Sequence, residues 1–189
     1  MRIIPRAAVA ALIAMLLGGP AASSVFARTG RIGYLGTVRG THAFVAVVTH
    51  GSRVTAYVCD SKTIAQWFKG SLQAGKATLT SRDGSVLRVV VADGKADGSF
   101  RAAGARGVVH RFSSSQAAKP AGLYRGVKTV AGKRYVGGWI VLSDGSQRGE
   151  VLTGATLVAS PILDPSNPTV DVKKGKKRPL IVIIAILIG

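Results

Sequence analysis

RVTAYVCDSKTIAQWFKG, residues Arg53–Gly70, is the stretch that decides the fold. In its first half, Arg53–Cys59, the aliphatic residues Val54, Ala56 and Val58 alternate with polar or larger side chains. Successive side chains of a strand point to opposite faces, so this alternation is typical of a strand with one fully buried face. The first half therefore predicts a β-strand that ends at an apolar position, where a lone cysteine would be a buried thiol.

The second half predicts a short helix over about 61–70. Ser61 is a residue type that caps helix N-termini, and Gly70 is one that ends helices. Three apolar side chains between them stand at positions i, i+3 and i+4 of one helical face: Ile64, Trp67 and Phe68. A helix this short is stable only when it docks on something larger. We expect its two aromatic rings to pack on a sheet or to cover the end of a barrel.

Short strand patterns separated by tight turns occupy the rest of the segment 28–159. Dipeptides that favour hairpin turns recur along it: Gly51-Ser52, Asp83-Gly84, Asp93-Gly94, Asp97-Gly98, Gly132-Lys133 and Asp144-Gly145. The Asp-Gly pairs predict turns rather than a calcium loop, because they lack its alternating ligand spacing. We therefore predict an all-β domain, an antiparallel up-and-down β-barrel, with a two-sheet β-sandwich as the alternative.

The N-terminal segment 1–27 has the features of a secretory signal peptide. Arg2 and Arg6 precede the uninterrupted apolar run Ala7–Leu17, and the segment ends in Val25-Phe26-Ala27, with the small residue that signal peptidase prefers. We expect cleavage after this alanine and export of the chain to the cell envelope or the exterior. An uncleaved N-terminal anchor is the alternative.

The C-terminal part has a different composition. Residues 160–179 form a Pro-containing basic linker, and residues 180–189 form a short apolar tail, half the length that a membrane-spanning helix needs. Five positive charges immediately precede the tail: Lys173, Lys174, Lys176, Lys177 and Arg178. We expect these side chains to contact an anionic membrane surface. The alternatives are a tail that continues as a longer membrane helix and a tail without function.

Positive charge is spread over the whole chain, which has 26 Lys+Arg against 8 Asp+Glu, a formal charge of +18. Such a balance attracts anions. For an exported protein the expected partners are anionic lipids or cell-wall polymers, and we expect no nucleic-acid partner. An apolar small ligand is a further expectation, bound between Trp67, Phe68 and Trp139 as an aromatic wall.

Signals of catalysis are weak. The histidines His42, His50 and His110 show no metal-ligand spacing, and no Gly-x-Ser-x-Gly elbow occurs. We therefore expect no enzymatic activity, no catalytic residue, no metal and no cofactor. A hydrolase of unrecognised type, using Asp60 or His110, is the least favoured alternative.

Two stretches carry a resemblance. YVCD at Tyr57–Asp60 with WFKG at Trp67–Gly70, and GWIVLSDG at Gly138–Gly145, are similar to segments of small exported proteins of actinobacteria that have no established function. The resemblance implies export and a β fold and transfers no catalytic residue. Together these observations predict an exported, non-enzymatic, surface- or membrane-associated envelope protein, with a secreted protein-interaction module as the alternative.

Overall fold

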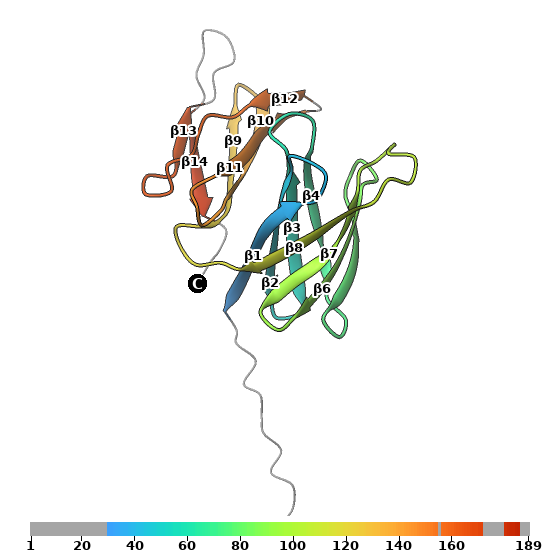
Figure 1. Ribbon diagram of the computed structural model, residues 1–189. Helices are drawn as coiled ribbons and strands as arrows, with labels where there is room; N and C mark the ends of the chain where they lie inside the picture. The colour runs from blue at the N-terminus through green and yellow to red at the C-terminus, as the bar shows by residue number, and fades with distance from the viewer. Residues whose placement is uncertain (1–29, 155, 172–179, 186–189) are drawn as a thin grey trace, which may run out of the picture.

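The computed structural model describes residues 30–154, 156–171 and 180–185. Fourteen strands and no helix occur in these ranges, which confirms the predicted all-β antiparallel fold. The strands form two sheets of eight and six strands (Figure 1). The predicted signal peptide, residues 1–27, and the basic run Lys173–Arg178 lie outside the described residues.

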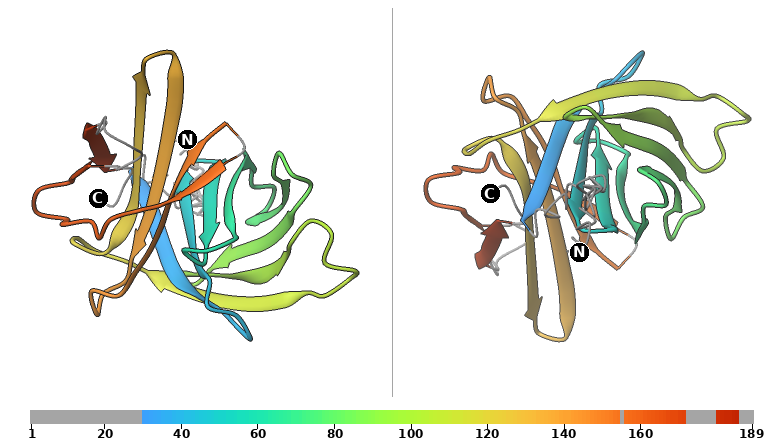
Figure 2. Two further views of the ribbon diagram at one scale, coloured as in Figure 1. Left: turned by 90° about the horizontal axis from the view of Figure 1, so that it is seen from above. Right: turned by 90° about the horizontal axis from the view of Figure 1, so that it is seen from below.

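The eight-stranded sheet is nearly closed into a barrel. Its strands are β1 (Arg31–Val38), β2 (Phe44–His50), β3 (Arg53–Cys59), β4 (Ala65–Ser71), β5 (Lys76–Thr80), β6 (Val86–Ala92), β7 (Lys95–Arg101) and β8 (His110–Gln116). They pair in the order β4-β3-β2-β1-β8-β7-β6-β5. The edge strands β4 and β5 are joined by a short turn with one isolated bridge, between Gln73 and Lys76. Figure 2 shows the sheet curling around its axis.

The six-stranded sheet, called here the second sheet, packs against the outside of the barrel beside β1 to β4 (Figures 1 and 2). It consists of β9 (Gly122–Val130), β10 (Lys133–Val141), β11 (Gln147–Thr153), β12 (Thr156–Ala159), β13 (Thr169–Asp171) and β14 (Leu180–Ala185), paired in the order β12-β11-β10-β9-β14-β13. The predicted linker thus contributes β13, and part of the predicted tail pairs with β9 as β14.

The apolar side chains form three clusters. The first fills the barrel, with Phe68, Leu87 and Phe100 among its most buried members. The second lies between the barrel and the second sheet, and the third lies on the far side of the second sheet, under the segment around Leu163. Successive side chains of a strand point to opposite faces of the sheet. One strand can therefore contribute side chains to two clusters, one on each face.

The predicted helix over 61–70 is wrong. Residues Ala65–Ser71 form strand β4, which pairs antiparallel with β3, and Ser61 has a φ of 63°. An N-cap needs an extended backbone at this position, so Ser61 cannot supply one. Strand geometry sends Trp67 to the outside of the barrel and Phe68 into it. Both rings are then packed on opposite sides, which one helical face could not achieve.

The Asp-Gly pairs divide into turns and strand. Asp93 and Gly94 have φ values of 50° and 72°, as the predicted hairpin turn requires. Asp97-Gly98 is not a turn, since both residues lie within β7. The backbone of Gly98 passes so close to Arg88 that a side chain would meet its carbonyl oxygen. The glycine is therefore needed for close strand packing. The side chain of the neighbouring Asp97 is on the opposite, outer face of the sheet and is exposed.

Candidate functional site

An open groove of about 1290 Å³ crosses the outside of the barrel over β5, β6, β7 and β8. Its lining is mostly polar: Arg39, Ser71, Gln73, Lys76, Ala77, Thr78, Arg88, Val89, Val90, Asp97, Gly98, Ser99, Val109, Arg111, Phe112 and Ser113. Figure 2 shows that β6 and β7 lie on the side of the barrel away from the second sheet. The groove thus lies on a part of the barrel surface that the second sheet does not cover.

Strand register arranges the outward side chains of the groove in two rows. In the first row Thr78 pairs with Arg88, Arg88 with Ser99, and Ser99 with Arg111. Arg39 extends this row, because its backbone N–H donates to the carbonyl oxygen of Arg111 at 2.9 Å. Hydroxyl and guanidinium groups therefore alternate across four strands.

The second row runs beside the first and contains the one carboxylate of the groove. Lys76 pairs with Val90, Val90 with Asp97, and Asp97 with Ser113. The hydroxyl of Ser113 donates to Asp97 Oδ1 at 2.7 Å. This hydrogen bond fixes the carboxylate on the floor of the groove.

Four cationic side chains and one acidic side chain line the groove, so its net charge is positive. The cations are Arg39, Lys76, Arg88 and Arg111, and the acid is Asp97. Guanidinium groups bind phosphates and carboxylates in two-pronged geometry, and hydroxyls add neutral donors and acceptors. The arrangement is suited to binding a hydroxyl-bearing anion.

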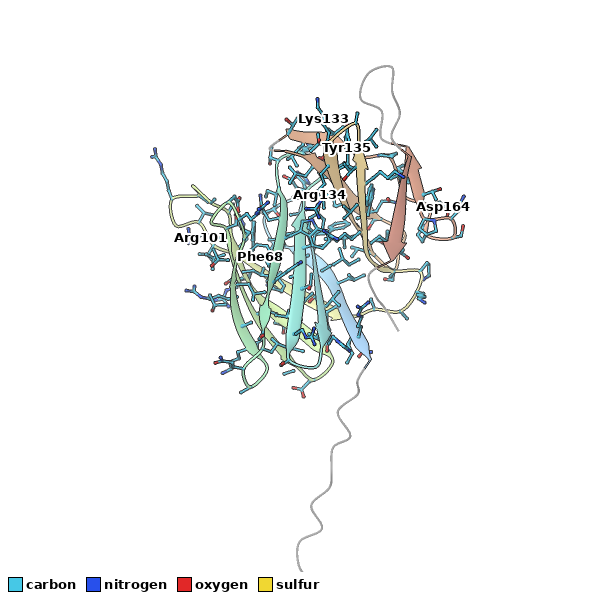
Figure 3. All side chains as sticks on the ribbon, turned by 180° about the vertical axis from the view of Figure 1, so that it is seen from behind. Phe68, Arg101, Lys133, Arg134, Tyr135 and Asp164 are labelled. Atoms are coloured by element: carbon cyan, nitrogen blue, oxygen red, sulfur yellow. The ribbon has the colours of Figure 1, made fainter. Side chains whose placement is uncertain are left out.

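The three aromatic residues predicted to form a ligand wall lie in three separate clusters. Phe68 is fully buried inside the barrel, where its ring meets Phe100 edge-on at 6.3 Å between centroids (Figure 3). Trp67 lies between the barrel and the second sheet, stacked on Tyr57 at 4.3 Å. Trp139 is fully buried in the third cluster. The structure does not bring these rings together around one cavity.

Trp139 has a clear structural role. It lies across the glycine pair Gly137 and Gly149, where added side chains would meet its ring. Its indole N–H donates to the carbonyl oxygen of Pro161 at 3.0 Å. The ring thereby fixes the chain that follows β12 onto the second sheet.

A buried carboxyl group lies between the two sheets. Glu150 is 3% exposed, and its Oε2 atom has no hydrogen-bond partner among the described residues. It pairs with Gly138 of β10, which packs against the rings of Tyr57 and Trp67. Burial, and after it the negative charge of Asp60, raises the pKa of the Glu150 carboxyl. Burying an unpaired carboxyl costs stability, most of all when it is ionised.

Asp60, one of the two residues considered for catalysis, has a structural role. The Asp60 carboxylate accepts from the backbone N–H groups of Lys62, Thr63 and Ile64, each at 2.8 Å, and so closes the turn after β3. Against the cost of partial burial, these hydrogen bonds lower the pKa of Asp60. Burial raises the pKa of the Cys59 thiol to about 11, as expected for an unreactive cysteine.

Within the ranges that the structure describes, no three His, Cys, Asp or Glu side chains are grouped so that they could bind a metal ion. Those same ranges include no helix with the length and apolar character that crossing a membrane requires.

Sequence reasoning missed the groove, although a signal for it exists. Arg88 and Arg111 stand at outward positions of strands whose neighbours Val89 and Phe112 point into the barrel. The alternation therefore places each arginine on the outside, but only the strand pairing shows that they share a row. Comparison with models of known protein families, with curated protein sequences and with solved structures gave no match.

Proposed function

We propose that this chain is an exported, non-enzymatic cell-envelope protein that binds an anionic envelope ligand in the groove over β5 to β8. The observation that carries the proposal is the alignment of Arg88, Arg111 and Arg39 in one row, with Lys76 in the next. Like charges repel, so a fold gains nothing from gathering them unless an anion is bound there.

The ligand class follows from charge and exposure. Each Lys or Arg near an anionic surface contributes about 1 kcal/mol, so four such side chains attract an anion without any enclosed pocket. This attraction weakens with salt, because the Debye length is about 8 Å at physiological ionic strength. An anionic ligand is favoured over the apolar one, since the three predicted aromatic wall residues are spread over three clusters.

Export and envelope association rest on the sequence. The segment 1–27 has the order of charge, apolar run and small residue that signal peptides have. An exported basic protein meets anionic lipids and wall polymers first. The predicted membrane-contact residues Lys173–Arg178 would add to this attraction from the C-terminal part of the chain.

A polyanion without a membrane tests the proposal. Fluorescently labelled inorganic polyphosphate is titrated with the purified chain, and anisotropy is followed over a series of salt concentrations. We expect binding that weakens with salt, and a loss of at least about tenfold in affinity for the double variant Arg88→Gln/Arg111→Gln, because hydrogen bonds to charged groups contribute about 1.5–3 kcal/mol each.

The matched control removes two charges elsewhere. Arg31 and Arg134 are exposed and do not line the groove, so Arg31→Gln/Arg134→Gln has the same net charge as the groove variant. We expect it to bind nearly as well as the unchanged chain. Equal losses in the two double variants would show that net charge alone attracts the anion, and the proposal would then be wrong.

A further inference from the structure

The geometry of the groove points to a specific shape of ligand. We propose that the groove binds a linear polyanion whose repeating units also carry hydroxyl groups, and that the bound polyanion lies across strands β5 to β8 rather than along them. The inference rests on the proposed function and names the ligand class for the same site.

The first row of side chains indicates the direction in which the bound polyanion runs. Arg88 and Arg111 are separated by one intervening strand, β7. Neighbouring strands lie about 4.8 Å apart, so these two positions are about 10 Å apart across the sheet. A single small anion placed on one guanidinium does not need the other. A polyanion with charges along its length contacts both guanidinium groups, and then contacts Arg39 beyond Arg111.

The positions between the cations select for hydroxyl groups. Ser99 lies between Arg88 and Arg111 in the first row. Asp97 and Ser113 lie beside it in the second row, joined by their hydrogen bond. An ionised carboxylate accepts hydrogen bonds and donates none, so it attracts ligand hydroxyls and repels ligand anions. A ligand that carries both anionic and hydroxyl groups offers a partner to the cationic side chains and to the Asp97 carboxylate, whereas one that carries anionic groups alone offers no donor to the carboxylate.

Shape favours a chain over a bilayer. The groove is an open depression of about 1290 Å³ over the sheet, and Gly98, which has no side chain, is among its lining residues. A lipid surface is flat over this length and reaches only the rim, whereas a single polymer chain can enter. Val90 and Val109 are 42% and 51% exposed in the groove and offer apolar contact to the carbon backbone of such a chain.

The discriminating experiment uses the full chain and two polyanions of equal length, poly(glycerol phosphate) and inorganic polyphosphate. The first carries a hydroxyl in each unit, and the second carries none. The variant Asp97→Asn keeps an oxygen that can accept from Ser113 but removes the negative charge. We expect this variant to bind polyphosphate more tightly, by about threefold or more, and poly(glycerol phosphate) more weakly by a similar factor.

Opposite signs for the two probes are the required result. If Asp97→Asn strengthens binding of both probes, the carboxylate acts only by repulsion, and the inference is overturned while the proposed function stands. A second overturning result has two parts. The unchanged protein binds poly(glycerol phosphate) no better than vesicles of phosphatidylglycerol, and Arg88→Gln/Arg111→Gln weakens only the vesicle binding. The partner is then a membrane, and the inference also fails. Loss of groove-dependent binding to every probe would overturn the proposed function itself.

Discussion

Glu150 is the only glutamate of the chain, and it occupies a buried position opposite Gly138. One of its carboxyl oxygens has no hydrogen-bond partner among the described residues. Burial raises the pKa of this carboxyl, and the nearby Asp60 carboxylate raises it further. The folded protein therefore holds a proton on Glu150 at pH values where the unfolded chain has released it. Stability must then fall as the pH rises from the ordinary pKa of glutamate to the raised one.

Replacing Glu150 with glutamine should remove this loss. We expect Glu150→Gln to be more stable than the unchanged chain by about 1–3 kcal/mol at about pH 8, because glutamine has no negative charge to bury beside Asp60, and to differ much less at about pH 4. Urea unfolding at the two pH values measures both differences. Asp93→Asn is the matched control, since Asp93 lies in an exposed hairpin turn where asparagine fits equally well. A difference between Glu150→Gln and the unchanged chain that does not change with pH would contradict the assignment.

At the scale of single elements, β4 is the strand on which helix and strand patterns compete. Trp67 and Phe68 are neighbours in sequence, and the structure packs them against different clusters. If β4 is a strand, Phe68 is a core residue and the next residue, Lys69, is exposed. We expect Phe68→Ala to cost about 3–5 kcal/mol and Lys69→Ala less than about 0.5 kcal/mol, measured by urea unfolding. Similar costs at both positions would be inconsistent with this strand.

The same element shows which parts of the fold could be predicted from sequence. The strand Arg53–Cys59 was predictable because alternation over seven residues has one simple explanation, and the structure has β3 at these residues. The residues after Asp60 were not, because spacing of i, i+3 and i+4 fits a helix face as well as a strand that is buried on both sides. Only the pairing of β4 with β3, a tertiary contact, decides between them.

Long-range pairing also explains why the candidate site was hidden. Arg39 and Arg111 are 72 positions apart in the chain, and a backbone hydrogen bond places them side by side. The sequence indicates a basic protein and outward arginines, but nothing local in it shows which of its 26 cationic residues share a surface. The predicted aromatic wall failed to assemble for the same reason, since rings chosen by type were distributed over three clusters.

At the scale of the whole molecule, the barrel and the second sheet depend on each other. Leu123 and Ile140 of the second sheet are 1% and 0% exposed because the barrel covers them. The connection is also polar: Gly149 N–H donates to the Ser61 hydroxyl at 3.0 Å, and Arg148 Nε donates to the carbonyl oxygen of His42 at 3.0 Å. The second sheet alone would expose this apolar surface, so we expect the two sheets to fold and unfold together.

Gly138 of the second sheet lies opposite the rings of Tyr57 and Trp67 of the barrel. A methyl group there would lie 2.7 Å from the Trp67 ring and 2.8 Å from the Tyr57 ring. We expect Gly138→Ala to destabilise the protein by about 1–3 kcal/mol, the usual cost of overpacking, in urea unfolding. Gly30→Ala is the control, since nothing lies within 4 Å of the added group. An unchanged midpoint for Gly138→Ala would mean that the rings can move aside freely.

The two tryptophans allow the coupling of the sheets to be measured directly. Trp67, on β4 of the barrel, lies at the interface between the two sheets, and Trp139 lies in the cluster on the far side of the second sheet. The variants Trp139→Phe and Trp67→Phe therefore each keep one tryptophan as a fluorescent reporter. In each variant, fluorescence is compared with far-ultraviolet circular dichroism, which follows the strands of both sheets. The face of the second sheet that carries Leu123 and Ile140 is covered by the barrel. We therefore expect the two signals to change at the same urea concentration within each variant, although the two variants differ in stability. A Trp139 signal that persists after the circular dichroism of most strands is lost would show that the second sheet folds by itself, and the interface around Gly138 would then join two independent units.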